Sequence, residues 1–115
     1  MVSCGDGYTS SPAKREYIDS INDSIAAGQQ NKETWAQTPE AIAGHFFPYI
    51  SHTEGGNKRY QIITQPISAK ECILTVINEG PIDDEIIGEH HEVNFQIHEG
   101  RWKIMDLVNS YKRRD

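Results

Sequence analysis

The sequence predicts an α+β fold with two to three N-terminal helices packed on one face of a curved, mostly antiparallel sheet of four or more strands. Helix-start signals and apolar residues at helical spacing occur only in the first half of the chain, up to Pro48. The second half contains four apolar stretches separated by turn residues. Helices followed by antiparallel strands generally gather on one side of the sheet.

The length of 115 residues fits one domain with a single core. We assign residues 1–10 to a flexible N-terminal segment, because Gly, Ser and Thr dominate it, and residues 11–115 to a single α+β domain. No stretch approaches the roughly 20 apolar residues of a membrane-spanning helix, so no span is expected.

The first helix is expected within "SSPAKREYIDSINDSIAAG", residues 10–28. Ser11 can cap it, Pro12 fits its first turn, and Gly28 can end it in a left-handed conformation. Four apolar residues share one helical face and predict its buried side: Tyr17, Ile18, Ile21 and Ile25.

A second helix is expected from Thr38-Pro39, another cap-plus-proline signal, to Pro48. Between the two helices, Trp35 is the one large apolar residue of a polar stretch, and we expect it to cover one end of the core. The buried side of the second helix is predicted to consist of Ile42, Phe46 and Phe47.

Four strands are expected after the Gly55-Gly56 loop, at residues 60–67, 71–80, 85–98 and 101–112. Pro66 suits an edge or the end of the first of them. The second is apolar on both faces, which predicts an interior strand covered on both sides. Gly88 lies within the third and predicts a bulge.

The strongest local pattern is the hairpin "HEVNFQIHEGRWKIMDLV", residues 91–108. A two-residue turn at Glu99-Gly100 places Ile97 opposite Trp102 and Phe95 opposite Ile104, so both apolar pairs share one face.

Beyond Ile104 the alternation slips, and two interpretations follow. An unbroken register directs His91 and Asp106 to the core face, where a carboxylate costs roughly several kcal/mol or takes up a proton. Acid–base sites use such perturbation. A bulge near Ile104–Met105 instead turns Asp106 to solvent, with Met105 and Leu107 inward; this apolar pair favours the bulge.

The charge pattern excludes one class of partner and suggests another. The net charge of −6 argues against nucleic-acid binding. No Lys or Arg occurs between Glu71 and Gly100, and this predicts either a solvated acidic edge or a docking face for a basic partner. The acidic residues of the span are Glu71, Glu79, Asp83, Asp84, Glu85, Glu89, Glu92 and Glu99.

The cysteines and histidines have no metal-site spacing. Cys4 and Cys72 could pair if the protein is exported. The opening "MVSCG" is similar to the end of a bacterial lipoprotein signal, which predicts a lipid anchor at Cys4 and a periplasmic or envelope location, the alternative being cytoplasmic. Adjacent His90 and His91 point to opposite faces of a strand, so we predict no metal site and no cofactor.

The helical pair, the loop and the strand pair ending in "EGRWKIMDL" resemble the nuclear transport factor 2-like (cystatin-like) superfamily over roughly residues 11–112. The stretch "IDDEIIGEHHEV" is similar to what precedes that hairpin in small bacterial lipoproteins of this kind. The resemblance implies a cone-like sheet around a long helix, with a pocket. In its isomerase-type members a carboxylate base and an acidic donor lie inside the cone, which here implies Asp106 and His91 with Tyr17 or Tyr60.

The function we expect is a non-catalytic binding or interaction domain of a bacterial envelope protein, for an unknown protein or small molecule. The candidate binding residues are Asp83, Asp84, Glu85, Glu89, His91 and Trp102. The alternative is a small-molecule isomerase or hydrolase, with His91, Asp106 and Tyr60 as catalytic candidates. We also expect a homodimer through the open sheet face, using the outward members of Ile73, Thr75 and Ile77, or of Leu74 and Val76.

Overall fold

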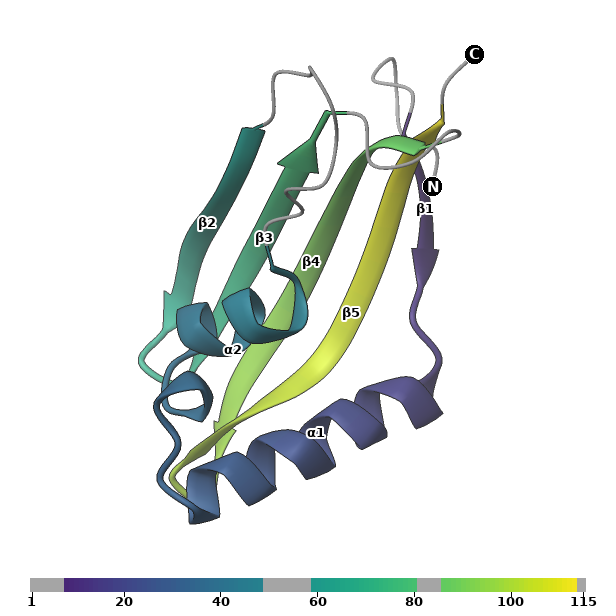
Figure 1. Cartoon of the computed structure of the whole chain (residues 1–115). Helices are drawn as coiled ribbons and strands as arrows, with labels where there is room; N and C mark the ends of the chain where they lie inside the picture. The colour runs from purple at the N-terminus through teal and green to yellow at the C-terminus, as the bar shows by residue number, and fades with distance from the viewer. Residues whose placement is uncertain (1–7, 49–58, 81–85, 114–115) are drawn as a thin grey trace.

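A computed structural model describes residues 8–48, 59–80 and 86–113. Within these ranges, five strands form one antiparallel sheet in the order β1-β5-β4-β3-β2, with α1 beside β5 and α2 in front of β2 and β3 (Figure 1). The elements are β1 (Tyr8–Pro12), α1 (Arg15–Gln30), the 3-10 turn η1 (Thr34–Ala36), α2 (Pro39–Phe46), β2 (Arg59–Ser68), β3 (Glu71–Glu79), β4 (Ile86–His98) and β5 (Arg101–Arg113).

The predicted architecture is wrong. A strand comes first, and both helices lie in the chain between β1 and β2, so they do not form an N-terminal layer. The sheet has five strands and is antiparallel throughout, and the described residues form an open sheet with edges at β1 and β2, not a cone (Figure 1).

The difference from the predicted fold begins at Ser11-Pro12, a dipeptide that predicts a helix start. Both residues belong to β1, where Ser11 pairs with Asn109 and Pro12 with Val108. A proline at the end of an edge strand costs no ladder hydrogen bond, so the same dipeptide satisfies either structure. Residues 8–10, which were assigned to the flexible segment, are also part of β1, while residues 1–7 lie outside the described part of the chain.

Gly28 does not end the first helix as predicted, because α1 continues to Gln30. It is buried, and a Cβ added to it would lie 2.7 Å from Cζ2 of Trp35. Glycine at this position therefore lets the indole pack against the helix. The chain reverses further on, at Lys32, whose φ of 59° is left-handed.

The predicted second helix is confirmed. The Thr38 hydroxyl accepts a hydrogen bond of 3.2 Å from the amide of Ala41, and Pro39 occupies the first turn of α2. The helices cover one face of the sheet, and the core between the two layers is formed by Ile18, Ile21, Ile25, Ile42, Ala43, Phe47, Cys72, Leu74, Val76, Val93, Phe95, Ile104 and Leu107.

The hairpin between β4 and β5 has the predicted register. Glu99 and Gly100 both have positive φ, 54° and 80°, and Ile97 pairs with Trp102. The register then shifts after the pair Phe95–Ile104, so that Met105 is the extra residue of a bulge. The bulge is thus confirmed: Leu107 is buried opposite Val93, and Asp106 is exposed opposite Asn94. Met105, which was also expected to turn inward, is only partly buried and is not part of the core. A second register shift next to Gly88 confirms the other predicted bulge.

Side chains of α1 protect the part of the β5 edge that β1 leaves uncovered. Arg15, Asn22 and Gln29 are seven residues apart and share a helical face. Asn22 bonds both the amide and the carbonyl of Ile104 at 2.8 Å, while Arg15 and Gln29 donate to the carbonyls of Met105 and Trp102 at 3.1 Å. Helix α1 thereby satisfies backbone groups that would otherwise remain open for pairing with another strand.

Candidate ligand-binding groove

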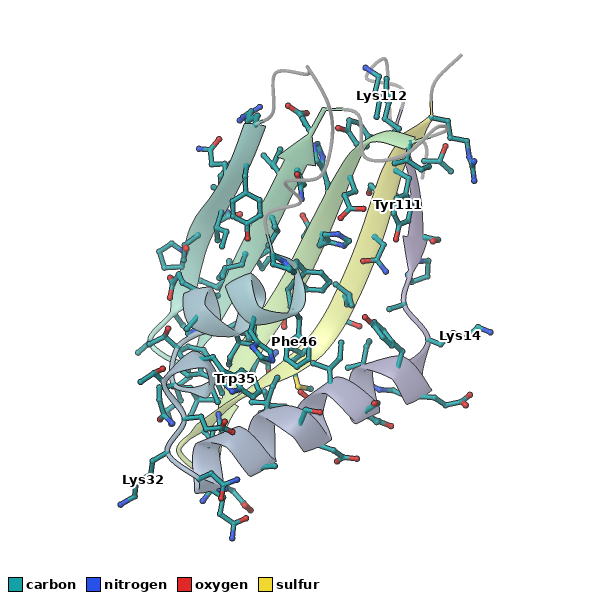
Figure 2. All side chains as sticks on the ribbon, viewed as in Figure 1. Lys14, Lys32, Trp35, Phe46, Tyr111 and Lys112 are labelled. Carbon is teal, nitrogen blue, oxygen red and sulfur yellow. The ribbon has the colours of Figure 1, made fainter. Side chains whose placement is uncertain are left out.

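An open groove of about 510 Å³ lies on the helix-bearing side of the sheet, at the end away from the β4–β5 hairpin. Its size falls in the range of small-molecule sites, roughly 300–1,000 Å³. Figure 2 labels two residues of the groove, Phe46 at the end of α2 and Tyr111 towards the end of β5. The groove is lined by Tyr17, Phe46, Phe47, Pro48, Glu89, His91, Asn109 and Tyr111.

His91 forms the floor of this groove. It is only 5% exposed, and its ring stacks on Phe47 with 4.2 Å between ring centroids and an interplanar angle of 17°. The ring of Tyr111 meets it edge-on at 6.4 Å. Contacts from Tyr111 of β5 and from Phe47, the residue that follows α2, therefore fix the imidazole in one orientation.

Both ring nitrogens of His91 have protein partners. Nε2 lies 3.1 Å from Oε1 of Glu89, and Nδ1 lies 2.7 Å from Oδ1 of Asn109. A carboxylate only accepts, so Nε2 carries a proton. If the Asn109 oxygen also accepts, the ring is an imidazolium; if the amide is turned, the ring is neutral and Nδ1 accepts. The first form makes the Glu89–His91 pair neutral, and the second gives it a net charge of −1.

A second row of polar groups supports the groove from β2 and β3. The hydroxyl of Tyr60 donates to the carbonyl of Phe47 at 2.7 Å, and burial raises the pKa of this phenol. The Nδ2 of Asn78 donates to the carbonyl of Pro48 at 3.4 Å. Asn78 is 1% exposed, and its Oδ1 has no hydrogen-bond partner among the described residues. Asn78 pairs with Glu89 in the ladder but does not line the groove.

The exposed rim of the groove is aromatic. Tyr17 of α1 is 50% exposed and Tyr111 of β5 is 37% exposed. Burial of its ring raises the pKa of the Tyr111 hydroxyl above its usual value, and the nearby Glu89 and Tyr17 raise it further. The hydroxyl of Tyr111 thus lies in the negative field of Glu89 and stays protonated at neutral pH.

Of the residues singled out in the sequence, the structure brings Tyr17, Glu89 and His91 into this one groove. Asp106 does not join them. After the bulge at Met105 it pairs with Asn94 on the other side of the sheet, and it is exposed. The predicted His91–Asp106 pair is therefore absent from the fold.

The remaining candidates are spread over the molecule. Trp102 packs against the opposite end of the core and lines a separate cavity of about 420 Å³ between α1 and the hairpin. Tyr60 is held by the Phe47 carbonyl and is not a groove-lining residue. The acidic stretch Asp83, Asp84 and Glu85 lies outside the described residues.

The opposite, helix-free face carries a second histidine–glutamate contact. His90 stacks on Tyr8 at 4.0 Å, and its Nε2 lies 3.3 Å from Oε2 of Glu79. Tyr8 and Arg59 also donate to the Glu79 carboxylate, at 3.1 Å and 3.3 Å. Burial would raise the pKa of the Glu79 carboxyl, but the hydrogen bonds from His90, Tyr8 and Arg59 and the charge of Arg59 lower it below its usual value.

Other chemistry finds little support in the described part of the chain. No group of three or more His, Cys, Asp or Glu side chains there is arranged to hold a metal ion. Cys72 is free and buried, and burial, followed by Glu40 and Glu71, raises the pKa of its thiol, which disfavours the reactive thiolate. Cys4 lies outside the described residues. None of the described helices is long and apolar enough to cross a membrane.

Sequence reasoning missed the groove residues Asn109 and Tyr111. The bulge at Met105 moves both onto the face of His91, so that Asn109 pairs with His91 and Tyr111 with Glu89. An unbroken strand would have placed Val108 there instead. The bulge was one of two alternatives in the sequence, and following it to the end of the strand would have identified both residues.

A comparison with protein-family models, with curated proteins and with solved structures found no match, so the resemblance to the nuclear transport factor 2-like superfamily stays a prediction.

Proposed function

We propose that this protein is a non-catalytic binding domain and that the groove over His91 holds a small ligand. The groove combines a usable volume, exposed aromatic walls and a few polar groups at its floor, which is the usual composition of a ligand site.

The observation that carries this proposal is the full engagement of His91. A general acid or base must reach the substrate proton directly or through one water. Here Glu89 and Asn109 occupy both ring nitrogens, and Phe47 covers one face of the ring. The imidazole is therefore suited to shaping and polarising a binding surface and has no free nitrogen for proton transfer.

The alternative, an isomerase or hydrolase, required His91 and Asp106 in one pocket. Since Asp106 is exposed on the opposite face, that mechanism lacks its base. Glu89 is the groove's only carboxylate among the described residues that line it, and it is already bonded to His91. A binding function without catalysis is consistent with these contacts, because it needs neither a free base nor a free histidine nitrogen.

The test is a screen of small polar and aromatic molecules against isotope-labelled protein by two-dimensional NMR. Binders should shift the resonances of Tyr17, Glu89, His91 and Tyr111 together. Replacing Tyr17 with Ala should weaken these binders, whereas Trp102→Phe, in the separate cavity, should not. Binders that shift only signals around Trp102, or a screen without any groove binder, would contradict the proposal.

Self-association through the helix-free face is a second part of the proposal. Leu74 and Val76 are in the core, so the outward set of β3 consists of Ile73, Thr75 and Ile77, but Ile77 is only 7% exposed, which leaves Ile73 and Thr75 for the contact. Next to them on β2, Ile63 is 42% exposed. A second copy would cover this apolar strip by two-fold pairing. Sedimentation should then find a species of twice 13.0 kDa that Ile73→Lys dissociates and Ser20→Lys, on α1, does not; a monomer would reject it.

The envelope location remains part of the proposal and rests on the sequence around Cys4 alone. Labelling bacteria that express this protein from its own gene with a fatty-acid probe should mark it, and Cys4→Ser should abolish the label. An unlabelled wild-type protein would argue for the cytoplasm.

A further inference from the structure

We infer that the ligand of this groove carries a protonated aliphatic amine, bound between the aromatic rim and Glu89. This inference rests on the proposed function, since it names the chemical class of the ligand for the same site. It is argued from the unused hydrogen-bonding capacity of the groove, from its aromatic walls and from its charge.

The one carboxylate among the described groove-lining residues, Glu89, has an oxygen available to a ligand. One oxygen of Glu89 bonds His91, and no hydrogen bond among the described residues reaches the other. A carboxylate oxygen only accepts hydrogen bonds, so a ligand with N–H groups can bond it, whereas a ligand that brings only acceptors cannot.

The walls suit a cation as well. Tyr17, Phe46 and Tyr111 line the groove with three rings on three different elements. The negative face of such a ring attracts an ammonium group within about 6 Å of its centre. A purely apolar ligand would use the same rings but would leave the second oxygen of Glu89 without a donor.

Charge favours the same ligand class. None of the described groove-lining residues is Lys or Arg, and Glu89 is the only one that carries a full negative charge. Around it, the span from Glu71 to Gly100 contains no Lys or Arg at all. An anionic ligand would therefore meet the carboxylate of Glu89 and neither a lysine nor an arginine in the described lining.

The probes are n-butylammonium, the neutral 1-butanol and the anionic butyrate, titrated at pH 7 into the isotope-labelled protein while the His91 and Tyr111 signals are followed. We expect butylammonium to bind at least about tenfold more tightly than butanol, since hydrogen bonds to charged groups are the stronger ones. Butyrate should bind most weakly.

The matched variants are Glu89→Gln, which keeps the shape and an acceptor for His91, and Glu92→Gln, the same change on the exposed face of the same strand. Glu89→Gln should lower the affinity for butylammonium about tenfold and leave butanol within twofold. Glu92→Gln should change neither by more than twofold. Tyr111→Leu should weaken butylammonium more than butanol.

The outcomes separate the two proposals. Equal binding of butanol and butylammonium at the groove overturns the amine inference and leaves the binding domain intact. Loss of butylammonium binding in both Glu89→Gln and Glu92→Gln overturns it too, because the attraction would then be a general effect of net charge. If neither these probes nor any molecule of the wider screen shifts groove signals, both proposals fail.

Discussion

His90 and His91 are neighbours in β4 with the same kinds of partners on opposite faces of the sheet. Each ring stacks on an aromatic ring, Tyr8 for His90 and Phe47 for His91, and each lies near a glutamate oxygen. Their surroundings differ. The His90 side chain is 27% exposed and its carboxylate partner also meets Arg59, whereas the His91 side chain is 7% exposed and its second nitrogen meets Asn109.

This difference indicates which of the two histidine–glutamate contacts is able to bind a ligand. On the helix-free face, three side chains bond the Glu79 carboxylate, and these bonds join β1, β2, β3 and β4. In the groove, Glu89 bonds only His91 among the described residues, next to open space and exposed rings. The two faces differ because the helices lie over only one of them. The groove forms on that face, between residues of α1, α2, β4 and β5.

The largest effect should come from comparing His91→Ala with His90→Ala. Removing the buried His91 ring leaves Glu89 and Asn109 without their partner and opens a cavity against Phe47, at a cost of about 2–4 kcal/mol in unfolding free energy. His90→Ala should cost about 1 kcal/mol or less, because water can replace a partly exposed partner. Urea unfolding measures both, and equal costs would contradict the distinction between the two faces.

The next effect concerns Gly88, on which the ring of Tyr8 lies. An added Cβ would lie 2.3 Å from the Tyr8 hydroxyl oxygen, so Gly88→Ala should destabilise the protein by about 1–3 kcal/mol. Combined with Tyr8→Phe, it should cost less than the sum of the two single changes, because the hydroxyl is then gone. Gly44→Ala, where a Cβ meets nothing within 4 Å, is the control and should be neutral or stabilising. A strictly additive pair would show that the Tyr8 hydroxyl is not the obstacle.

A smaller effect should appear in the pH dependence of Glu79→Gln. The folded-state pKa of the Glu79 carboxyl is lowered, so its stabilising effect is present above the unfolded value of about 4.3 and is lost as pH falls through the folded value. The variant should be less stable than wild type at pH 7, by about 1 kcal/mol at most because the site is partly exposed, and the gap should close in acid. Denaturant midpoints at several pH values test this, and a gap that widens in acid would refute it.

The smallest effect is a shift in the titration of Tyr111. Glu89 helps to raise the pKa of this phenol, so Glu89→Gln should lower it, while Glu79→Gln on the other face should leave it unchanged. Carbon-13 NMR of the tyrosine ring follows the titration of the single residue. An equal response to both variants would mean that the two faces are not electrostatically separate.

The sequence by itself determined the parts of the fold that local chemistry specifies. The Thr38-Pro39 signal gave the start of α2 correctly, and the alternation on either side of Glu99-Gly100 gave the hairpin register, because a one-residue slip would have turned every apolar side chain to the wrong face. The four predicted strands correspond to β2 to β5, and Pro66 does lie in an edge strand, as predicted.

Only the tertiary structure decided the rest, because the deciding partners are distant in the chain. Ser11-Pro12 satisfies a helix start and a strand end equally well, and the unpaired edge of β5 about 100 residues later selects the strand. Gly28 lies where the indole of Trp35 packs against α1. The bulge at Met105 separates Asp106 from His91 and brings Asn109 to it, and the helix layer then determines which of the two adjacent histidines lies in a groove.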